Sequence, residues 1–117
     1  MHFELKKKNI WDKLQNIYEG DDKVNKAKLQ THRRYFDSLK MGDEENVASY
    51  FLRVDEIVNT IRGLGENIEN SVIVKNTLRS LRMRFDPKIS TIEEREDIST
   101  LSMDKLHWIL TAYEMMT

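Results

Sequence analysis

Apolar residues recur along this chain at the three- and four-residue spacing of helices that bury one face. The longest such stripe lies mid-sequence and continues for about five helical turns. Its members are Val47, Tyr50, Phe51, Val54, Ile57, Val58, Ile61 and Leu64. Gly63 and Gly65 supply a C-terminal stop, since glycine readily takes the left-handed conformation that ends helices. This stretch therefore predicts an amphipathic helix.

Two further helices are expected before this stripe. The first is predicted over residues 4–19, and its periodic apolar face places Trp11 in the core. That face comprises Ile10, Trp11, Leu14, Ile17 and Tyr18. The residues at 20–22, Gly-Asp-Asp, form a turn sequence, so a second helix is expected over 23–39. Its buried positions are Val24, Ala27, Phe36 and Leu39.

Residues 70–81 form a segment whose start is ambiguous. The β-branched residues 72–74 also suit a strand. No second strand is predicted for it to pair with, and Leu78 and Leu81 continue a helical period. The segment is therefore predicted to be a helix.

Capping signals define two more helices. Asp86 followed by proline is typical of a helix start and predicts a short helix over residues 87–95. Ser102 is expected to cap the last helix, with Leu101 and Leu106 as a hydrophobic staple. The whole pattern predicts an all-α fold, a compact bundle of about six helices.

Composition supports this fold class and excludes several others. The chain has 117 residues but only four glycines and one proline, so it offers few places to turn. Cysteine is absent, which excludes a disulfide framework and a thiolate zinc site. No apolar run approaches the ~20 residues that span a bilayer, so no membrane partner is expected.

The net charge of −1 is the sum of a basic N-terminal part and an acidic C-terminal part. Residues 1–41 hold ten Lys or Arg and six Asp or Glu, whereas residues 42–117 hold nine and fourteen. Lys23, Lys26, Arg33 and Arg34 follow one side of the second predicted helix. They are candidates for sequence-independent contact with RNA phosphates, or they form a solvated face paired with nearby acids.

No catalytic constellation is recognisable. The chain lacks a nucleophile elbow, a phosphate loop and a His-Glu-x-x-His motif. The three histidines, His2, His32 and His107, are too far apart in sequence to suggest a metal clip. We therefore expect no enzyme, no cofactor, no metal site and no small-molecule substrate.

The last predicted helix carries more apolar surface than one face requires. Its inner face comprises Leu106, Ile109, Leu110 and Tyr113. Trp108, Ala112 and Met115 lie on a second side, as expected either of a protein interface or of further core.

A set of residues spread in order along the chain carries a family resemblance. They are Ile10-Trp11-Asp12-Lys13-Leu14, Lys26-Ala27-Lys28-Leu29-Gln30, Arg33-Arg34, Phe36, Glu45-Asn46-Val47, Tyr50-Phe51, Arg53-Val54, Leu78-Arg79-Ser80-Leu81, Phe85-Asp86, Ile92-Glu93-Glu94 and residues 101–106. Over residues 8–114 the chain resembles the Gag polypeptide domain of copia-type LTR retrotransposons. The resemblance implies a helical capsid-like domain that self-associates into a particle packaging RNA, in the cytoplasm.

The resemblance also implies a division near Gly42. Residues 1–41 would be the tail of the N-terminal helical half of a capsid protein, and residues 42–117 its C-terminal, dimer-forming domain. Residues 45–54 resemble the start of the retroviral capsid's major homology region, which implies a fold-stabilising hydrogen-bond network. Its candidate members are Tyr50, Phe51, Arg53 and Val54.

By the same analogy, self-association is expected through the fourth and the last predicted helices. The candidate interface residues are Val72, Ile73, Lys75, Asn76, Trp108, Ala112 and Met115. The expected partner is a second copy or a longer Gag chain. Two alternatives stay open: an RNA-binding module that uses the basic face, and a host-adopted Gag fragment that modulates assembly.

Overall fold

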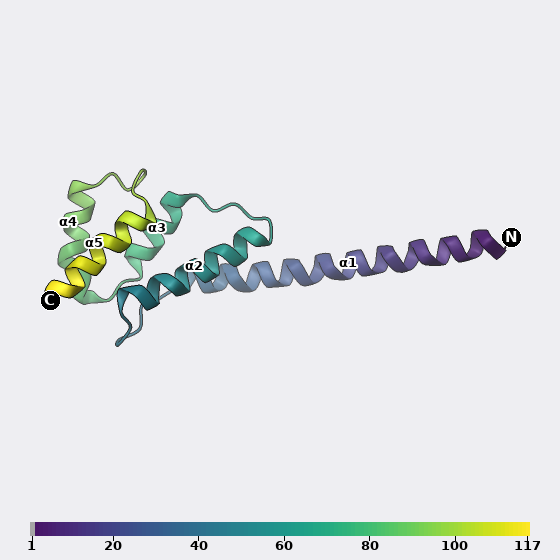
Figure 1. The fold of residues 1–117 in the computed structure, drawn as a ribbon, viewed down its shortest axis with the longest axis horizontal. Helices are drawn as coiled ribbons and strands as arrows, with labels where there is room; N and C mark the ends of the chain where they lie inside the picture. Colours follow the sequence, from purple (N-terminus) through teal and green to yellow (C-terminus); the bar gives the residue numbers. More distant parts are fainter. Residues whose placement is uncertain (1) are drawn as a thin grey trace.

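The computed structural model describes the backbone of residues 2–117 and the side chains from residue 9 onward. All regular structure in this range is helical, which confirms the all-α fold. The helices are α1 (His2–Asp37), α2 (Val47–Gly63), α3 (Asn70–Arg79), the 3-10 turn η1 (Met83–Phe85), α4 (Asp86–Arg95) and α5 (Met103–Met116). The molecule measures 77 × 29 × 18 Å because α1 projects from a body formed by the other helices (Figure 1).

Helix α1 continues without a break through Gly20, so the predicted turn at residues 20–22 is wrong. A Cβ atom at Gly20 would meet nothing within 4 Å, so no close packing demands glycine there. One turn later, an ion pair of 3.2 Å joins Lys26 to Asp22 across the helix surface. The first two predicted helices are therefore one. Long as it is, α1 lacks the continuous apolar character needed to cross a membrane, as do the other described helices.

The free part of α1 is surrounded by solvent. Trp11, predicted to be in the core, is 67% exposed, and Val24 and Ala27 are also exposed rather than buried. The other members of the predicted first apolar face are more than half exposed as well: Ile10, Leu14, Ile17 and Tyr18. The prediction failed because periodicity identifies an apolar face but does not say what covers it. Only the last part of α1, from Leu29 onward, packs against the body.

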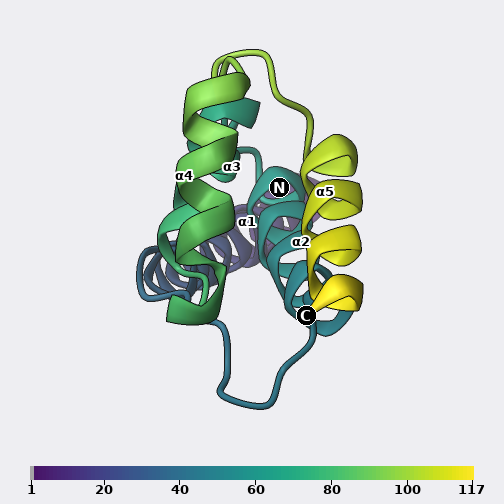
Figure 2. The ribbon, with the colours of Figure 1, turned by 90° about the vertical axis from the view of Figure 1, so that its left-hand side faces the viewer.

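Helix α2 is the centre of the body and follows its sequence pattern closely. Asn46 caps it by accepting a hydrogen bond of 2.8 Å from the Ser49 backbone N–H. Its buried residues are Val47, Tyr50, Phe51, Val54, Val58 and Ile61. Phe36, Leu39 and Met41 join the same hydrophobic cluster from the end of α1 and the loop after it. Viewed from its end, the body has α2 and α5 on one side and α3 and α4 on the other (Figure 2).

The remaining helices begin close to where capping signals predicted. Ser102 caps α5 by accepting a hydrogen bond of 3.1 Å from the Lys105 backbone N–H, and Leu101 and Leu106 are both buried. Helix α4 starts at Asp86, one residue earlier than predicted. Residues 70–79 are helical rather than extended.

Candidate interaction surfaces

Helix α5 presents a large aromatic side chain outward. Leu106 and Leu110 face the core and are fully buried, whereas Trp108 is 72% exposed. Met115, near the end of the same helix, is also exposed, and Ala112 is half-buried. The sequence left this side of the helix as either a protein interface or further core. For Trp108 and Met115, burial in the core of this chain is wrong. Both are available to another molecule.

A groove of about 640 Å³ lies beside Trp108, between α4 and α5. Its lining residues are Pro87, Lys88, Thr91, Trp108, Ile109, Ala112, Tyr113, Met116 and Thr117. Most of these side chains are apolar or aromatic, so the groove suits an apolar side chain from a partner. Trp108 and the groove together form what we call the α5 surface.

The four candidate interface residues on α3 divide into two pairs. Val72 and Lys75 are exposed, but Ile73 and Asn76 are only 3% and 5% exposed and belong to the core of the single chain. Asn76 Nδ2 donates a hydrogen bond of 2.7 Å to the Phe36 carbonyl, and its side-chain oxygen accepts one from Arg79. A buried amide satisfied in this way joins the end of α1 to α3. The expectation that Ile73 and Asn76 form a surface is therefore corrected.

Two of the four candidate RNA-binding residues form ion pairs with acidic residues of the same chain. The Arg33 guanidinium forms a bidentate ion pair with the carboxylate of Glu66, which lies in the loop after α2. These hydrogen bonds lower the pKa of Glu66 and raise that of Arg33. Lys26 pairs with Asp22, while Lys23 and Arg34 are exposed. The structure thus brings the four residues onto one helix but neutralises part of their charge internally.

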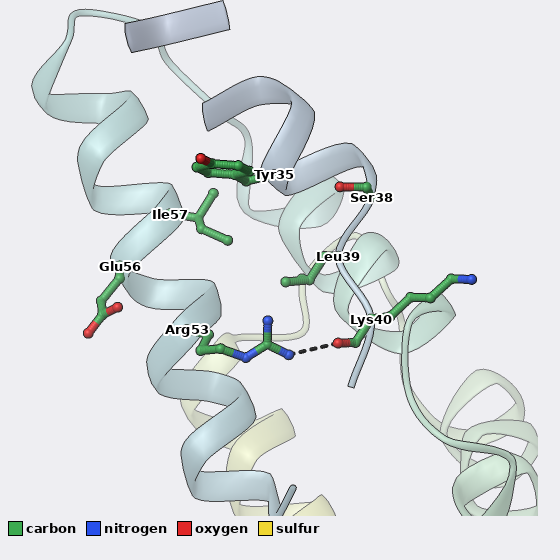
Figure 3. A pocket seen from close by; sticks show the side chains of 7 residues that line it. All are labelled: Tyr35, Ser38, Leu39, Lys40, Arg53, Glu56 and Ile57. Atoms are coloured by element: carbon green, nitrogen blue, oxygen red, sulfur yellow. Dashed lines mark hydrogen bonds between the residues drawn. The ribbon is translucent and has the colours of Figure 1, made fainter. Parts of the chain in front are cut away.

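Arg53 is the centre of a polar network at the start of α2. Its Nε and Nη2 groups each donate a hydrogen bond of 2.7 Å to the carboxylate of Glu45. Nη2 also donates to the Lys40 carbonyl at 2.7 Å, and this bond crosses the hollow between α2 and the end of α1 (Figure 3). Glu45 in turn accepts a hydrogen bond of 2.9 Å from the Gly42 backbone N–H. This network closes the loop of residues 38–46 onto α2.

Three other residues of the homology-like segment are core residues. Tyr50 is fully buried and donates a hydrogen bond of 2.9 Å to the Thr77 carbonyl; its burial raises the pKa of the phenol to about 12. The Phe51 ring stacks on His107 of α5, with 4.8 Å between ring centroids. Val54 is fully buried. Together they connect α2 to α3 and α5.

The free part of α1 forms a surface that the sequence analysis assigned to the core. We call it the α1 stripe: Ile10, Trp11, Leu14, Ile17 and Tyr18. Trp11, Leu14 and Tyr18 also border a shallow hollow of about 230 Å³. Ile10, Ile17 and Val24 are seven residues apart, which keeps them on one face across Gly20. That spacing is the sequence signal for one continuous helix.

The described geometry defines an all-helical domain with two exposed apolar surfaces, one on α5 and one on α1. The family profile described as gag-polypeptide of LTR copia-type matches residues 6–116. The chain therefore belongs to the copia-type LTR retrotransposon Gag polypeptide family, which confirms the resemblance. This is a family of structural polypeptides. Neither curated proteins nor solved structures gave a significant match.

Proposed function

We propose that this chain is a structural Gag domain that self-associates through exposed helix faces, as in the assembly of a retrotransposon particle. The observation that carries the proposal is the α5 surface, where Trp108 stands 72% exposed beside an apolar groove. Exposed tryptophans next to pockets are typical anchors of protein interfaces. The partner is a second copy or a longer Gag chain, and assembly takes place in the cytoplasm.

The arrangement of the α5 surface favours pairing between identical copies. Trp108 lies at the border of the groove between α4 and α5, so a two-fold axis can place the Trp108 ring of each copy into the groove of the other. Such an interface uses one surface twice and closes as a dimer. Val72 and Lys75 of α3 are exposed and stay separate candidates for self-association.

Solution mass tests the proposal directly. Light scattering after size exclusion, over a hundredfold concentration range and at low and high salt, should detect a dimer or larger species that persists in high salt. Trp108→Ala should weaken this association, whereas Leu52→Ala, at an exposed leucine of α2, should leave it unchanged. Equal effects of the two substitutions would argue against the α5 surface.

The two alternatives predict other outcomes. An RNA-binding module would bind single-stranded RNA of any sequence and lose affinity steeply as salt rises. Because Arg33 and Lys26 already have acidic partners, that affinity would depend on Lys23 and Arg34. A modulator of assembly would change the number of particles formed when it is mixed with longer Gag chains.

A further inference from the structure

The α1 stripe is an apolar helix face with no covering element in the described chain. Trp11 and Tyr18 are 67% and 75% exposed, and Leu14, midway along the stripe, is 57% exposed. Isolated helices gain most of their stability when another element covers their apolar face. The position of the stripe, at the end of the molecule away from the α5 surface, makes it a separate site (Figure 1).

Charges around the stripe are arranged antisymmetrically about Leu14. Two helical turns before it lies Lys7, and two turns after it lies Asp21, so positions 7, 14 and 21 share one line along α1. The neighbours repeat the signs: Lys6 and Lys8 come before the stripe, and Glu19 and Asp22 come after it. A helix with this distribution is complementary to its own reversed copy.

We propose that the α1 stripe pairs with the α1 stripe of a second copy, antiparallel and centred on Leu14. In this arrangement Leu14 meets Leu14, Ile10 lies opposite Tyr18, and Trp11 opposite Ile17. Position 7, a lysine, then lies opposite position 21 of the other copy, an aspartate, and this happens twice. A parallel pair would instead place lysine against lysine and aspartate against aspartate, which is unfavourable.

The size of the stripe predicts a dimer of moderate affinity. The four aromatic side chains of the pair, Trp11 and Tyr18 of each copy, together bury on the order of 600–1,000 Å². A standard protein interface buries about 1,600 Å². The aliphatic residues and the charge pairs must supply the rest, so concentrations of micromolar and above are needed to observe the pair.

The proposal goes beyond self-association at α5, and Trp108→Ala separates the two interfaces. In the 117-residue chain carrying Trp108→Ala, light scattering should still detect a dimer at high concentration. Adding Leu14→Asp should make this chain monomeric, whereas Leu52→Asp, at a leucine of similar exposure, should not. A Trp108→Ala chain that is folded by circular dichroism yet monomeric at every concentration would overturn the α1 pair; the wild-type chain would still test the α5 surface.

Charge reversal tests the orientation. Asp21→Lys alone, and Lys7→Asp alone, should each raise the dissociation constant of the α1 pair about tenfold at low salt. The double substitution Lys7→Asp with Asp21→Lys should restore it, because each new pair is again of opposite sign. Failure of the double variant to recover would overturn the antiparallel register.

Cross-linking provides a second, independent readout, since the chain contains no cysteine of its own. A mixture of Ile10→Cys chains and Tyr18→Cys chains of different mass, both in the Trp108→Ala background, should form the mixed disulfide dimer on oxidation. Ile10→Cys chains alone should not, because the two cysteines would lie about 12 Å apart along the helices. Efficient cross-linking of Ile10→Cys to itself would show a parallel pair and overturn the proposal.

Discussion

The guanidinium of Arg53 donates two hydrogen bonds of 2.7 Å each to the carboxylate of Glu45. Eight residues separate the pair in sequence, and the contact joins the first turns of α2 to the loop that arrives from α1. The side chain of Glu45 is only 15% exposed, so its charge depends on this partner more than on water. This ion pair therefore acts together with the hydrogen bonds from Arg53 to the Lys40 carbonyl and from the Gly42 backbone N–H to Glu45 in closing the loop onto α2.

Removing the guanidinium should destabilise the fold. Arg53→Gln is expected to lower the free energy of unfolding by about 1–2 kcal/mol, a range that allows for the partial exposure of Arg53. Urea unfolding followed by circular dichroism measures the change. Arg95→Gln, on the exposed side of α4, is the matched control and should have little effect. Similar losses for both arginines would contradict a specific role of Arg53.

The same pair makes stability depend on pH in a defined direction. Hydrogen bonding from Arg53 holds the pKa of Glu45 below its ordinary value of 4.5. A carboxyl whose pKa is lowered by folding stabilises the native state fully above its unfolded pKa and loses that effect as pH falls through the folded pKa. The difference in unfolding free energy between wild type and Glu45→Gln should therefore be constant from about pH 6 to 7 and shrink below about pH 4.5. A difference that grows towards acid pH would contradict this sign.

Two adjacent residues of α2 provide a direct test of burial. Phe51 is 4% exposed and stacks on His107, whereas Leu52 is 60% exposed. Phe51→Ala is expected to cost about 3–5 kcal/mol of unfolding free energy, and Leu52→Ala less than about 0.5 kcal/mol. Denaturant titration measures both. Comparable losses would mean that α2 is rotated from the described orientation.

Continuity of α1 can be tested at Gly20. Glycine inside a helix is less favourable than alanine by about 1 kcal/mol, and a Cβ atom at this position meets no neighbour. Gly20→Ala should therefore slow amide hydrogen exchange in residues 15–25, while exchange in the body stays the same. If residues 20–22 formed a turn instead, alanine would not protect these amides.

The body of this fold could be predicted from sequence because each of its helices repeats its core contacts every turn. The stripe of α2 and the cap and staple of α5 are local signals, and the structure follows them. On α3, the pattern of Ile73, Val74, Thr77 and Leu78 indicates the buried face, but the interface expectation came from analogy and placed Ile73 outside. Asn76 could not have been predicted to be buried, because its partner, the Phe36 carbonyl, lies 40 residues away.

The α1 region failed for a different reason. Gly-Asp-Asp at residues 20–22 resembles a turn locally, but glycine and aspartate tolerate a helix when the flanking turns are helical. The seven-residue spacing of Ile10, Ile17 and Val24 was the longer-range signal that outweighs the local one. Exposure of Trp11 has no sequence signal at all, since it depends on which elements are present to cover α1.

Because α1 is unbroken, its segment between the α1 stripe and Leu29 is a rigid helical connection to the body. From Leu14 to Leu29, where α1 first packs against the body, the helix rises about 22 Å, so an antiparallel pair would hold two bodies about 45 Å apart. Inserting one residue near Gly20 would rotate the body by about 100° around the axis of α1. Inserting seven residues would add about 10 Å and nearly preserve the rotation. In such a pair, the number of residues in this straight segment would set both the distance and the torsion between the two bodies.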